Sequence, residues 1–259
     1  MEPHYTFGDT NAAADRLVLL ARAFESSSAR LLASLACPSP ARAVDLGCGP
    51  GLTTRLLHRT LGAGKTWGLD ASERLIARAR AQFGDELSFA VQDVTSTPLP
   101  VSDVDAFYAR YLLTHLASPR DVLAACAAAG HPGSVLVLEE NCALQSPDPL
   151  FEGYYGCVAQ LQSHYGQNMF VGERLAELAA GTPWRVASYE RARFVLDGRT
   201  MARLHAMNVR SWRTDPFAIA AFNATELDAM TADLDDVAEG RRAGPEVTCL
   251  MGQIVLSLN

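Results

Sequence analysis

The sequence predicts an α/β fold in which helices cover a doubly wound, mostly parallel sheet. The first observation is a glycine-rich loop, at residues 47–51, between an apolar segment and a helical one. The second is that two later apolar segments, Thr66–Asp70 and Leu87–Val94, carry a carboxylate near their C-terminal ends. The third is the alternation of strand and helix patterns up to residue 140. This alternation is typical of parallel strands joined by crossover helices.

Length and composition limit the class of protein. With 259 residues, 49% of them hydrophobic, the chain suits one large domain with a full core. The formal net charge of -7 and the lack of a long Lys/Arg cluster argue against a nucleic-acid partner. The 6 cysteines form no Cys-x-x-Cys pair, so no metal site is expected. Without a leader pattern or an apolar stretch of membrane-spanning length, we expect a cytoplasmic protein with no membrane partner.

The glycine loop has the chemistry of a nucleotide cradle. Gly47, Gly49 and Gly51 alternate along the loop, where they permit unusual backbone angles and let a ligand lie against bare amides before a helix. The third glycine comes one residue too early for the dinucleotide pattern G-x-G-x-x-G, and the chain lacks the phosphate-loop pattern G-x-x-x-x-G-K-[ST].

The string from Val44 to Gly51 resembles the first motif of class I S-adenosylmethionine-dependent methyltransferases, in which an acidic residue and Leu precede G-x-G-x-G. The resemblance covers residues of about 41 to 140 in detail and the rest loosely. It implies a Rossmann-like sheet of seven strands with an antiparallel last strand. It also implies S-adenosyl-L-methionine as cofactor, bound at the motif by Asp45, Gly47, Cys48, Gly49 and Gly51.

Two carboxylates follow the next strands at the spacing that the resemblance requires. Asp70, about twenty residues beyond the loop, can accept hydrogen bonds from both ribose hydroxyls of an adenosine ligand. Asp93 matches the family's carboxylate that accepts a hydrogen bond from the adenine amino group. The neighbouring residues Ala71, Gln92 and Val94 complete this part of the predicted site. For each aspartate, an ordinary turn role is the alternative.

The N-terminal segment is predicted to form a helical lid. Apolar residues recur at helical spacing from about Asn11 to Leu35, and a Pro-containing segment then ends the pattern. In many small-molecule methyltransferases such a segment closes over the cofactor. The resemblance therefore suggests Tyr5 and Arg16 as contacts to the methionine end of the cofactor, with a core Tyr and a solvated Arg as the alternative.

The fourth and fifth strands supply further candidates for the site. The resemblance places Arg110, at the end of the strand Val104–Arg110, beside the methyl-transfer region. His115 is a candidate general base because the usual pKa of histidine is about 6.5, although a structural hydrogen-bonding role is the alternative. Glu140, after the fifth strand, and His164 are the other candidate bases. A base is needed only when the acceptor carries a proton of high pKa.

Residues 143–183 occupy the family's place for a helical insertion that covers the substrate. The segment is rich in Tyr, Gln, Asn and His, which can hold a drug-sized, partly aromatic molecule by stacking and hydrogen bonding. A partner interface competes with this interpretation, and a homodimer is left open. The candidate substrate residues are Tyr111, Tyr154, Tyr155 and Asn168.

We therefore predict one methyltransferase domain over residues 1–259. It divides into a lid at 1–37, a cofactor-binding core at 38–142, the insertion at 143–183 and the C-terminal part of the sheet at 184–259. The predicted reaction is in-line methyl transfer to an oxygen, nitrogen or carbon of a small, aromatic or heteroaromatic natural product. Positioning alone can supply roughly 7–11 kcal/mol of such a barrier. The alternatives are a protein that binds the cofactor for a non-methylating reaction and a regulatory protein.

Overall fold

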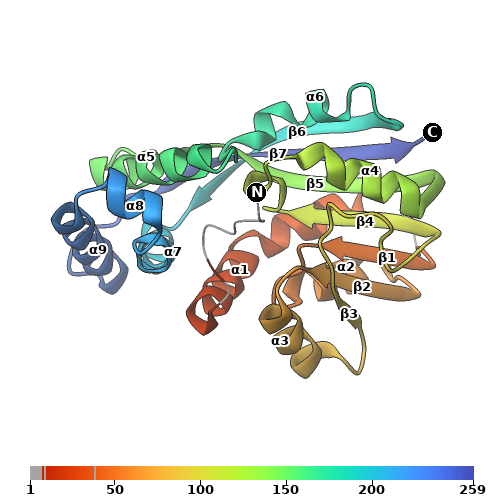
Figure 1. The fold of residues 1–259 in the computed structure, drawn as a ribbon, viewed down its shortest axis with the longest axis horizontal. Helices are drawn as coiled ribbons and strands as arrows, with labels where there is room; N and C mark the ends of the chain where they lie inside the picture. Colours follow the sequence, from red (N-terminus) through yellow and green to blue (C-terminus); the bar gives the residue numbers. More distant parts are fainter. Residues whose placement is uncertain (1–7, 9, 38) are drawn as a thin grey trace.

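Seven strands form one sheet in the computed structural model, which describes residues 8, 10–37 and 39–259 (Figure 1). The strand order is β3-β2-β1-β4-β5-β7-β6. Neighbouring strands from β3 to β5 pair in parallel, whereas β7 is antiparallel to both β5 and β6. The predicted sheet, with its antiparallel last strand, is confirmed. The strands are β1 Arg42–Leu46, β2 Lys65–Asp70, β3 Ser88–Val91, β4 Val104–Arg110, β5 Gly130–Gln145, β6 Trp184–Leu196 and β7 Val247–Leu258.

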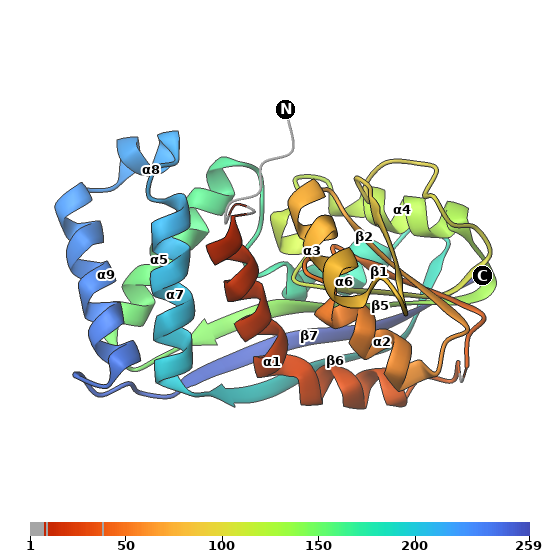
Figure 2. The ribbon, with the colours of Figure 1, turned by 90° about the horizontal axis from the view of Figure 1, so that it is seen from below.

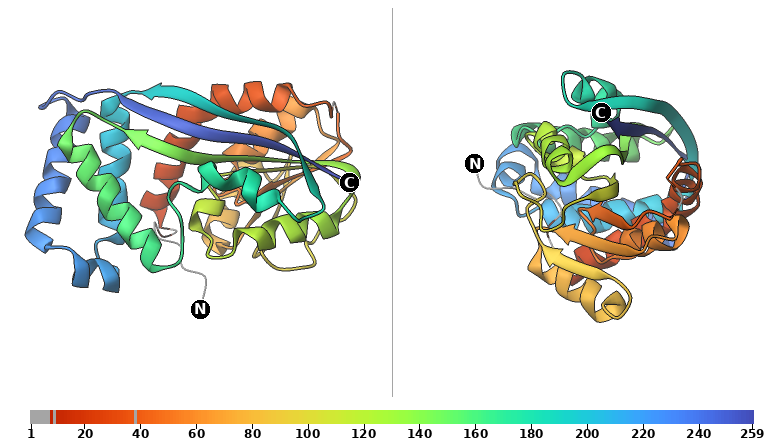
Figure 3. Two further views of the ribbon diagram at one scale, coloured as in Figure 1. Left: turned by 90° about the horizontal axis from the view of Figure 1, so that it is seen from above. Right: turned by 90° about the vertical axis from the view of Figure 1, so that its right-hand side faces the viewer.

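Helices cover both faces of this sheet (Figure 3). Along β4, Phe107 and Ala109 belong to the core that includes α4 and α6, whereas Ala106 and Tyr108 face the core with α1 and α2. This alternation follows from the period-2 geometry of a strand buried on both faces. The helices are α1 Asn11–Ala33, α2 Leu52–Leu61, α3 Glu73–Phe83, η1 Leu113–His115, α4 Pro119–Ala129, α5 Pro149–His164, η2 Val171–Arg174, α6 Leu175–Ala179, α7 Gly198–Trp212, α8 Pro216–Ala221 and α9 Ala224–Glu239.

Four helices, α5, α7, α8 and α9, form a helical lobe beside the parallel part of the sheet (Figures 1 and 2). The lobe packs on the C-terminal ends of β5 and β6 and the N-terminal end of β7, and its core also takes in Phe24 of α1. Of the predicted insertion at 143–183, α5 joins this lobe, whereas Leu175 and Ala179 of α6 pack in the core of the sheet. The sequence predicted the helical insertion that contains α5, but not that α5 would pack together with α7, α8 and α9.

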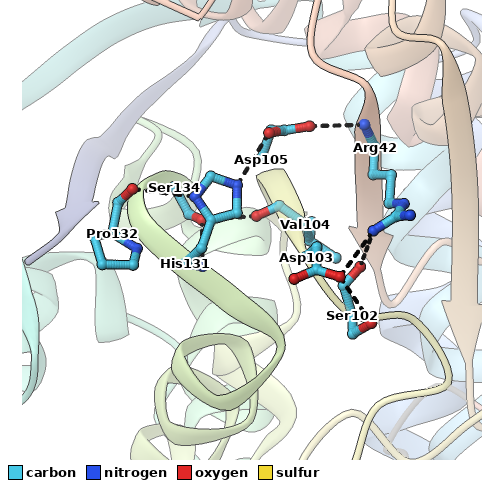
Figure 4. A network of polar contacts seen from close by, with 8 residues as sticks. All are labelled: Arg42, Ser102, Asp103, Val104, Asp105, His131, Pro132 and Ser134. Carbon is cyan, nitrogen blue, oxygen red and sulfur yellow. Dashed lines mark hydrogen bonds and ion pairs between the residues drawn. The ribbon is translucent and has the colours of Figure 1, made fainter.

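A polar network joins the starts of three neighbouring strands (Figure 4). One Asp105 oxygen accepts a hydrogen bond from the Arg42 backbone N–H at 2.8 Å, and the other lies 3.1 Å from His131 Nε2. The Ser134 hydroxyl donates to the Val104 carbonyl at 2.7 Å and accepts from the His131 N–H at 2.8 Å. These bonds tie β1, β4 and β5 together at their amino ends. They lie at the opposite edge of the sheet from the carboxyl ends, where open parallel sheets bind their ligands.

Candidate functional site

A cavity of about 710 Å³ lies at the carboxyl ends of β1, β2 and β4, between the glycine loop, α1 and the turn after β4. Its volume is in the range of cavities that hold small molecules and cofactors. Most of the predicted cofactor residues line it, although they come from segments far apart in the chain. The predicted residues in its wall are Arg16, Gly47, Cys48, Gly49, Asp70, Ala71, Gln92, Asp93, Val94, Arg110, Tyr111 and His115.

The glycine loop has the backbone conformation that makes glycine necessary. Gly47, Gly49 and Gly51 have φ of 66°, 53° and 86°, in the region that side chains disfavour. A Cβ on Gly47 would lie 2.9 Å from Leu112 Cδ1, and one on Gly49 would lie 3.2 Å from Leu17 Cδ1. The loop is therefore closely faced by both α1 and the turn after β4. Gly51 lies outside the cavity wall.

Asp70 links the glycine loop to the start of α3. Its Oδ2 accepts a hydrogen bond from the Gly49 backbone N–H at 2.9 Å, and its Oδ1 accepts one from the Ser72 N–H at 2.9 Å. Ser72 in turn caps α3 by accepting from the Leu75 N–H at 3.2 Å. The carboxylate thus stands at the ends of β1 and β2, beside the bare backbone of the loop.

Asp93 has both a turn role and a place in the cavity wall. Its Oδ1 accepts from the backbone N–H of Thr95 at 2.9 Å and from the Thr95 hydroxyl at 2.6 Å. Partial burial raises the pKa of Asp93, but the hydrogen bonds from Thr95 and Ser96 outweigh it and lower the pKa below its usual value. The carboxylate is therefore ionised near neutral pH.

Asp45 lies outside the cavity wall and contacts the start of α2, the helix that follows the glycine loop. It is almost fully buried, and its Oδ2 accepts from the hydroxyls of Thr53 and Thr54, each at 2.7 Å. Burial raises the pKa of Asp45 to about 7, although the two threonine hydroxyls oppose the shift. The acidic residue of the motif therefore fixes the first turn of α2 to β1.

We expect the buried carboxyl of Asp45 to make folding stability pH-dependent. Because its pKa rises from 3.8 unfolded to about 7 folded, its contribution is full below the lower value and lost as pH rises through the higher one. Relative to Asp45→Asn, the free energy of unfolding of the parent should fall by about 1.4 kcal/mol per pH unit within this window. Urea unfolding at several pH values measures the difference. A difference that does not change with pH would contradict the shifted pKa.

Arg110 is held in the cavity wall by a buried network. Its Nη1 donates to the Ser28 hydroxyl at 2.9 Å, and Ser28 donates to Glu139 Oε2 at 2.6 Å. Tyr108 donates to the same carboxylate at 2.5 Å, and Gln253 Nε2 donates to its other oxygen at 2.6 Å. These bonds join α1 to β4, β5 and β7. Sequence reasoning did not identify Ser28 or Gln253, which carry no motif.

The three candidate bases lie in different surroundings. His115 lines the cavity, and its Nδ1 lies 3.3 Å from Gln162 Nε2. Burial, with a smaller effect of nearby Arg16, lowers the pKa of His115 to about 3. His164 is exposed, stacks on Phe217 at 4.3 Å, and lies outside the cavity wall. Of the two histidines predicted as bases, His115 and His164, only His115 lines the cavity, and its ring is neutral.

Glu140, the third candidate base, also lies outside the cavity wall. Its side chain is fully buried, and Oε1 accepts hydrogen bonds from the backbone N–H groups of Leu112 and Leu113. Burial raises the pKa of Glu140 to about 8, against the lowering effect of these hydrogen bonds. The carboxyl therefore carries a proton near neutral pH.

The candidate substrate residues are divided between the cavity and the helical lobe. Tyr111 lines the cavity and packs edge-on against Phe24, with ring centroids 5.4 Å apart. Tyr154 and Tyr155 are buried in the lobe, where their hydroxyls contact Asn208 and His205. Neither they nor Asn168 lines the cavity, whereas the neighbouring Tyr165 and Gln167 do. Tyr5, predicted as a cofactor contact, lies outside the described residues.

Residues 44–138 match the family model of a methyltransferase domain. The glycine loop and the strand order described above agree with this match, so residues 44–138 are similar to a methyltransferase domain in sequence, and the sheet has the arrangement expected of class I S-adenosylmethionine-dependent methyltransferases. Within the part of the chain that the structure describes, no helix combines the length and hydrophobicity needed to cross a bilayer. The same residues contain no group of three or more His, Cys, Asp or Glu placed to hold a metal ion.

Several relatives are named trans-aconitate 2-methyltransferase, and two of them show the extent of the similarity. The protein of Variovorax paradoxus is 35% identical over 118 residues, which cover 46% of this chain and 43% of the relative. That of Methylobacterium nodulans is 33% identical over 162 residues, or 62% and 58% of the two chains. The chain thus spans about half the length of these relatives. The structure of geranyl diphosphate C-methyltransferase from Streptomyces coelicolor is similar in fold, with a TM-score of 0.56, 15% identity and coverage of 99% of this chain and 89% of that one.

Proposed function

We propose that the chain binds S-adenosyl-L-methionine in the 710 Å³ cavity and catalyses transfer of its methyl group to a small acceptor. The observation that carries the proposal is the meeting of Gly49 and Asp70. There, a left-handed glycine backbone and a carboxylate at the next strand end lie within hydrogen-bond distance, 2.9 Å, in the cavity wall. This combination suits a nucleoside whose ribose hydroxyls need an acceptor beside bare backbone.

The residues in the cavity wall fit the separate parts of this cofactor. Asp70 would accept hydrogen bonds from the ribose hydroxyls, and ionised Asp93 would accept one from the adenine amino group. Arg16, whose side chain is only 5% exposed, would pair with the methionine carboxylate. When bound, the cofactor supplies a methyl group activated by the sulfonium to which it is attached.

The protein's own contribution to this reaction is positioning and exclusion of water. Leu17 and Leu20 of α1 and Leu112 and Leu116 after β4 bring apolar surface to the cavity. Holding both reactants in line within such a site can supply roughly 7–11 kcal/mol of the barrier. Tyr111, a neighbour in the same wall, offers a ring that would stabilise a nearby cation by about 0.5–2 kcal/mol.

For the acceptor, we propose a small molecule with an aromatic or heteroaromatic ring, of the kind found among natural products. Tyr111 and Tyr165 both line the cavity together with the leucines named above, so a flat, partly apolar molecule can pack there. Gln167, which is buried in the same wall, offers an amide for hydrogen bonding.

A polycarboxylate is the second candidate acceptor. Two arginines, Arg16 and Arg110, line the same cavity, and the methionine carboxylate needs only one of them. Arginine recognises carboxylates through paired N–H groups. The relatives named trans-aconitate 2-methyltransferase support the same chemistry for the acceptor.

We expect His115 to act as a neutral hydrogen-bonding group and not as a general base. Because burial lowers its pKa to about 3, the ring does not change charge between about pH 5 and 8. In kinetic assays, His115→Gln should lower kcat/KM by about fivefold to tenfold, the effect of one hydrogen bond, and keep the shape of the pH profile. An inflection near about pH 6.5 that disappears in the variant would contradict this role.

Product analysis by mass spectrometry tests the proposed function. The protein is incubated with S-adenosylmethionine and, separately, with phenols, indoles, amines and polycarboxylates including trans-aconitate. A gain of one methyl group, matched by formation of S-adenosylhomocysteine, supports methyl transfer, and the substrate class that reacts decides between the two acceptors. A product formed without S-adenosylhomocysteine would overturn methyl transfer in favour of a non-methylating reaction, and cofactor binding that alters only a partner's activity would favour a regulatory role.

A further inference from the structure

The turn after β4, residues Tyr111–His115, forms part of the cavity wall and needs support to hold its shape. Tyr111 begins it with φ of 55°, a left-handed conformation that residues other than glycine seldom adopt. The short helix η1 follows, and its N-cap residue, Leu112, provides no side-chain hydrogen bond. The first N–H groups of such a turn need acceptors from elsewhere. Tyr111, Leu112 and His115 all line the cavity.

Glu140 supplies the missing acceptor from the neighbouring strand β5. Its Oε1 accepts from the Leu112 N–H at 2.8 Å and from the Leu113 N–H at 2.6 Å. Oε2 is buried and has no hydrogen-bond partner among the described residues, so the polar contacts of this carboxyl are directed to the turn. Burial raises the pKa of Glu140 to about 8, and a proton on Oε2 leaves Oε1 as the acceptor.

The far end of the same turn is held by α5 and the segment after it. Gln162 Nε2 donates to the Thr114 carbonyl at 3.2 Å and lies 3.3 Å from His115 Nδ1. The Thr114 hydroxyl donates to the Asn168 carbonyl at 3.0 Å. Glu140 therefore fixes the start of the turn, and Gln162 fixes its end. A change at Glu140 would reach Tyr111 and His115 through the backbone.

We propose that Glu140 is a positioning residue, which sets the cavity wall through the backbone N–H groups of Leu112 and Leu113 without touching the acceptor. Two consequences of this role do not depend on the reaction. The N–H groups of Leu112 and Leu113 should be protected from solvent exchange, and an uncharged acceptor oxygen in place of the carboxyl should be enough to protect them. The third consequence, for catalysis, rests on the proposed methyl transfer.

Amide hydrogen exchange of the full-length protein, without cofactor or acceptor, tests the structural part. Glu140→Leu removes the acceptor at similar volume, and it should speed exchange at Leu112 and Leu113 by about tenfold or more. Glu140→Gln keeps an acceptor oxygen, so its exchange should stay within about threefold of the parent. Amides of β1 serve as the internal control. Exchange in both variants equal to that of the parent would overturn the proposal.

Kinetics of Glu140→Gln then separate positioning from chemistry and remain decisive where Glu140→Leu does not fold. For a positioning residue, kcat should stay within about threefold of the parent, with an unchanged pH profile. A loss of about 100-fold or more with normal exchange at Leu112 and Leu113 would instead show a direct chemical role and overturn the proposal. If the parent transfers no methyl group, the proposed function fails while the exchange result still tests Glu140.

Discussion

Gly49→Val is expected to weaken cofactor binding by about 100-fold or more while the chain still folds. The valine side chain would occupy part of the cavity that we propose for the cofactor. Gly49 lines the cavity with φ of 53°, and a Cβ there would lie 3.2 Å from Leu17 Cδ1. The Gly49 N–H also donates to Asp70, so a shift of the loop would displace the carboxylate. Calorimetric titration with S-adenosylhomocysteine measures the effect.

Gly133→Val is the matched control for this experiment. Gly133 also has a left-handed φ, of 94°, but a Cβ there would meet nothing within 4 Å, and it lies outside the cavity wall. Both variants carry the cost of a left-handed side chain, about 1–2 kcal/mol, which unfolding measurements can compare. Only Gly49→Val should lose the ligand. Parent-like affinity in Gly49→Val would show that the loop does not cradle the cofactor.

Asp70→Ala should have the second largest effect, a loss of cofactor affinity of about 10-fold to 100-fold. The carboxylate is the acceptor proposed for the ribose hydroxyls, and hydrogen bonds to a charged group contribute about 1.5–3 kcal/mol. Loss of the carboxylate also removes the acceptor of the hydrogen bonds that the Gly49 and Ser72 N–H groups donate to it. Asp70→Asn keeps one acceptor oxygen and should fall between Asp70→Ala and the parent in calorimetry.

An exposed acid away from the cavity, Asp85, provides the charge control for Asp70. Asp85→Ala removes the same formal charge, so an effect of net charge alone would appear in both Asp85→Ala and Asp70→Ala. We expect the parent affinity in Asp85→Ala. Unchanged affinity in Asp70→Ala would mean that another residue holds the ribose.

The parts of the site that lie close together in sequence were predictable. The alternating glycines predicted a left-handed loop, and all three have positive φ. Asp70 ends β2 and Asp93 follows β3, and both line the cavity because the carboxyl ends of parallel strands meet at one edge of the sheet. The seven-stranded, mostly parallel sheet and its antiparallel last strand also agree with the prediction.

Two features could not be predicted from the sequence: the contacts between distant segments and the direction in which each side chain points. Ser28 and Glu139 lie 111 residues apart, and no pattern in a single sequence links them. Asp45 is one strand residue from the loop but points to α2, because strand side chains alternate between faces. Tyr154 has the residue type expected of a substrate wall, yet its helix face packs inside the helical lobe. Only tertiary packing decides which neighbour a helix face meets.

Calorimetric titration of the parent protein with S-adenosylmethionine tests whether this cavity is the cofactor site. We expect one site per chain, with affinity weakened by about 100-fold or more in Gly49→Val, by about 10-fold to 100-fold in Asp70→Ala, and not at all in Gly133→Val. A folded parent protein that gives no binding heat, or binding that both cavity variants leave unchanged, would contradict the claim that this cavity is the cofactor site.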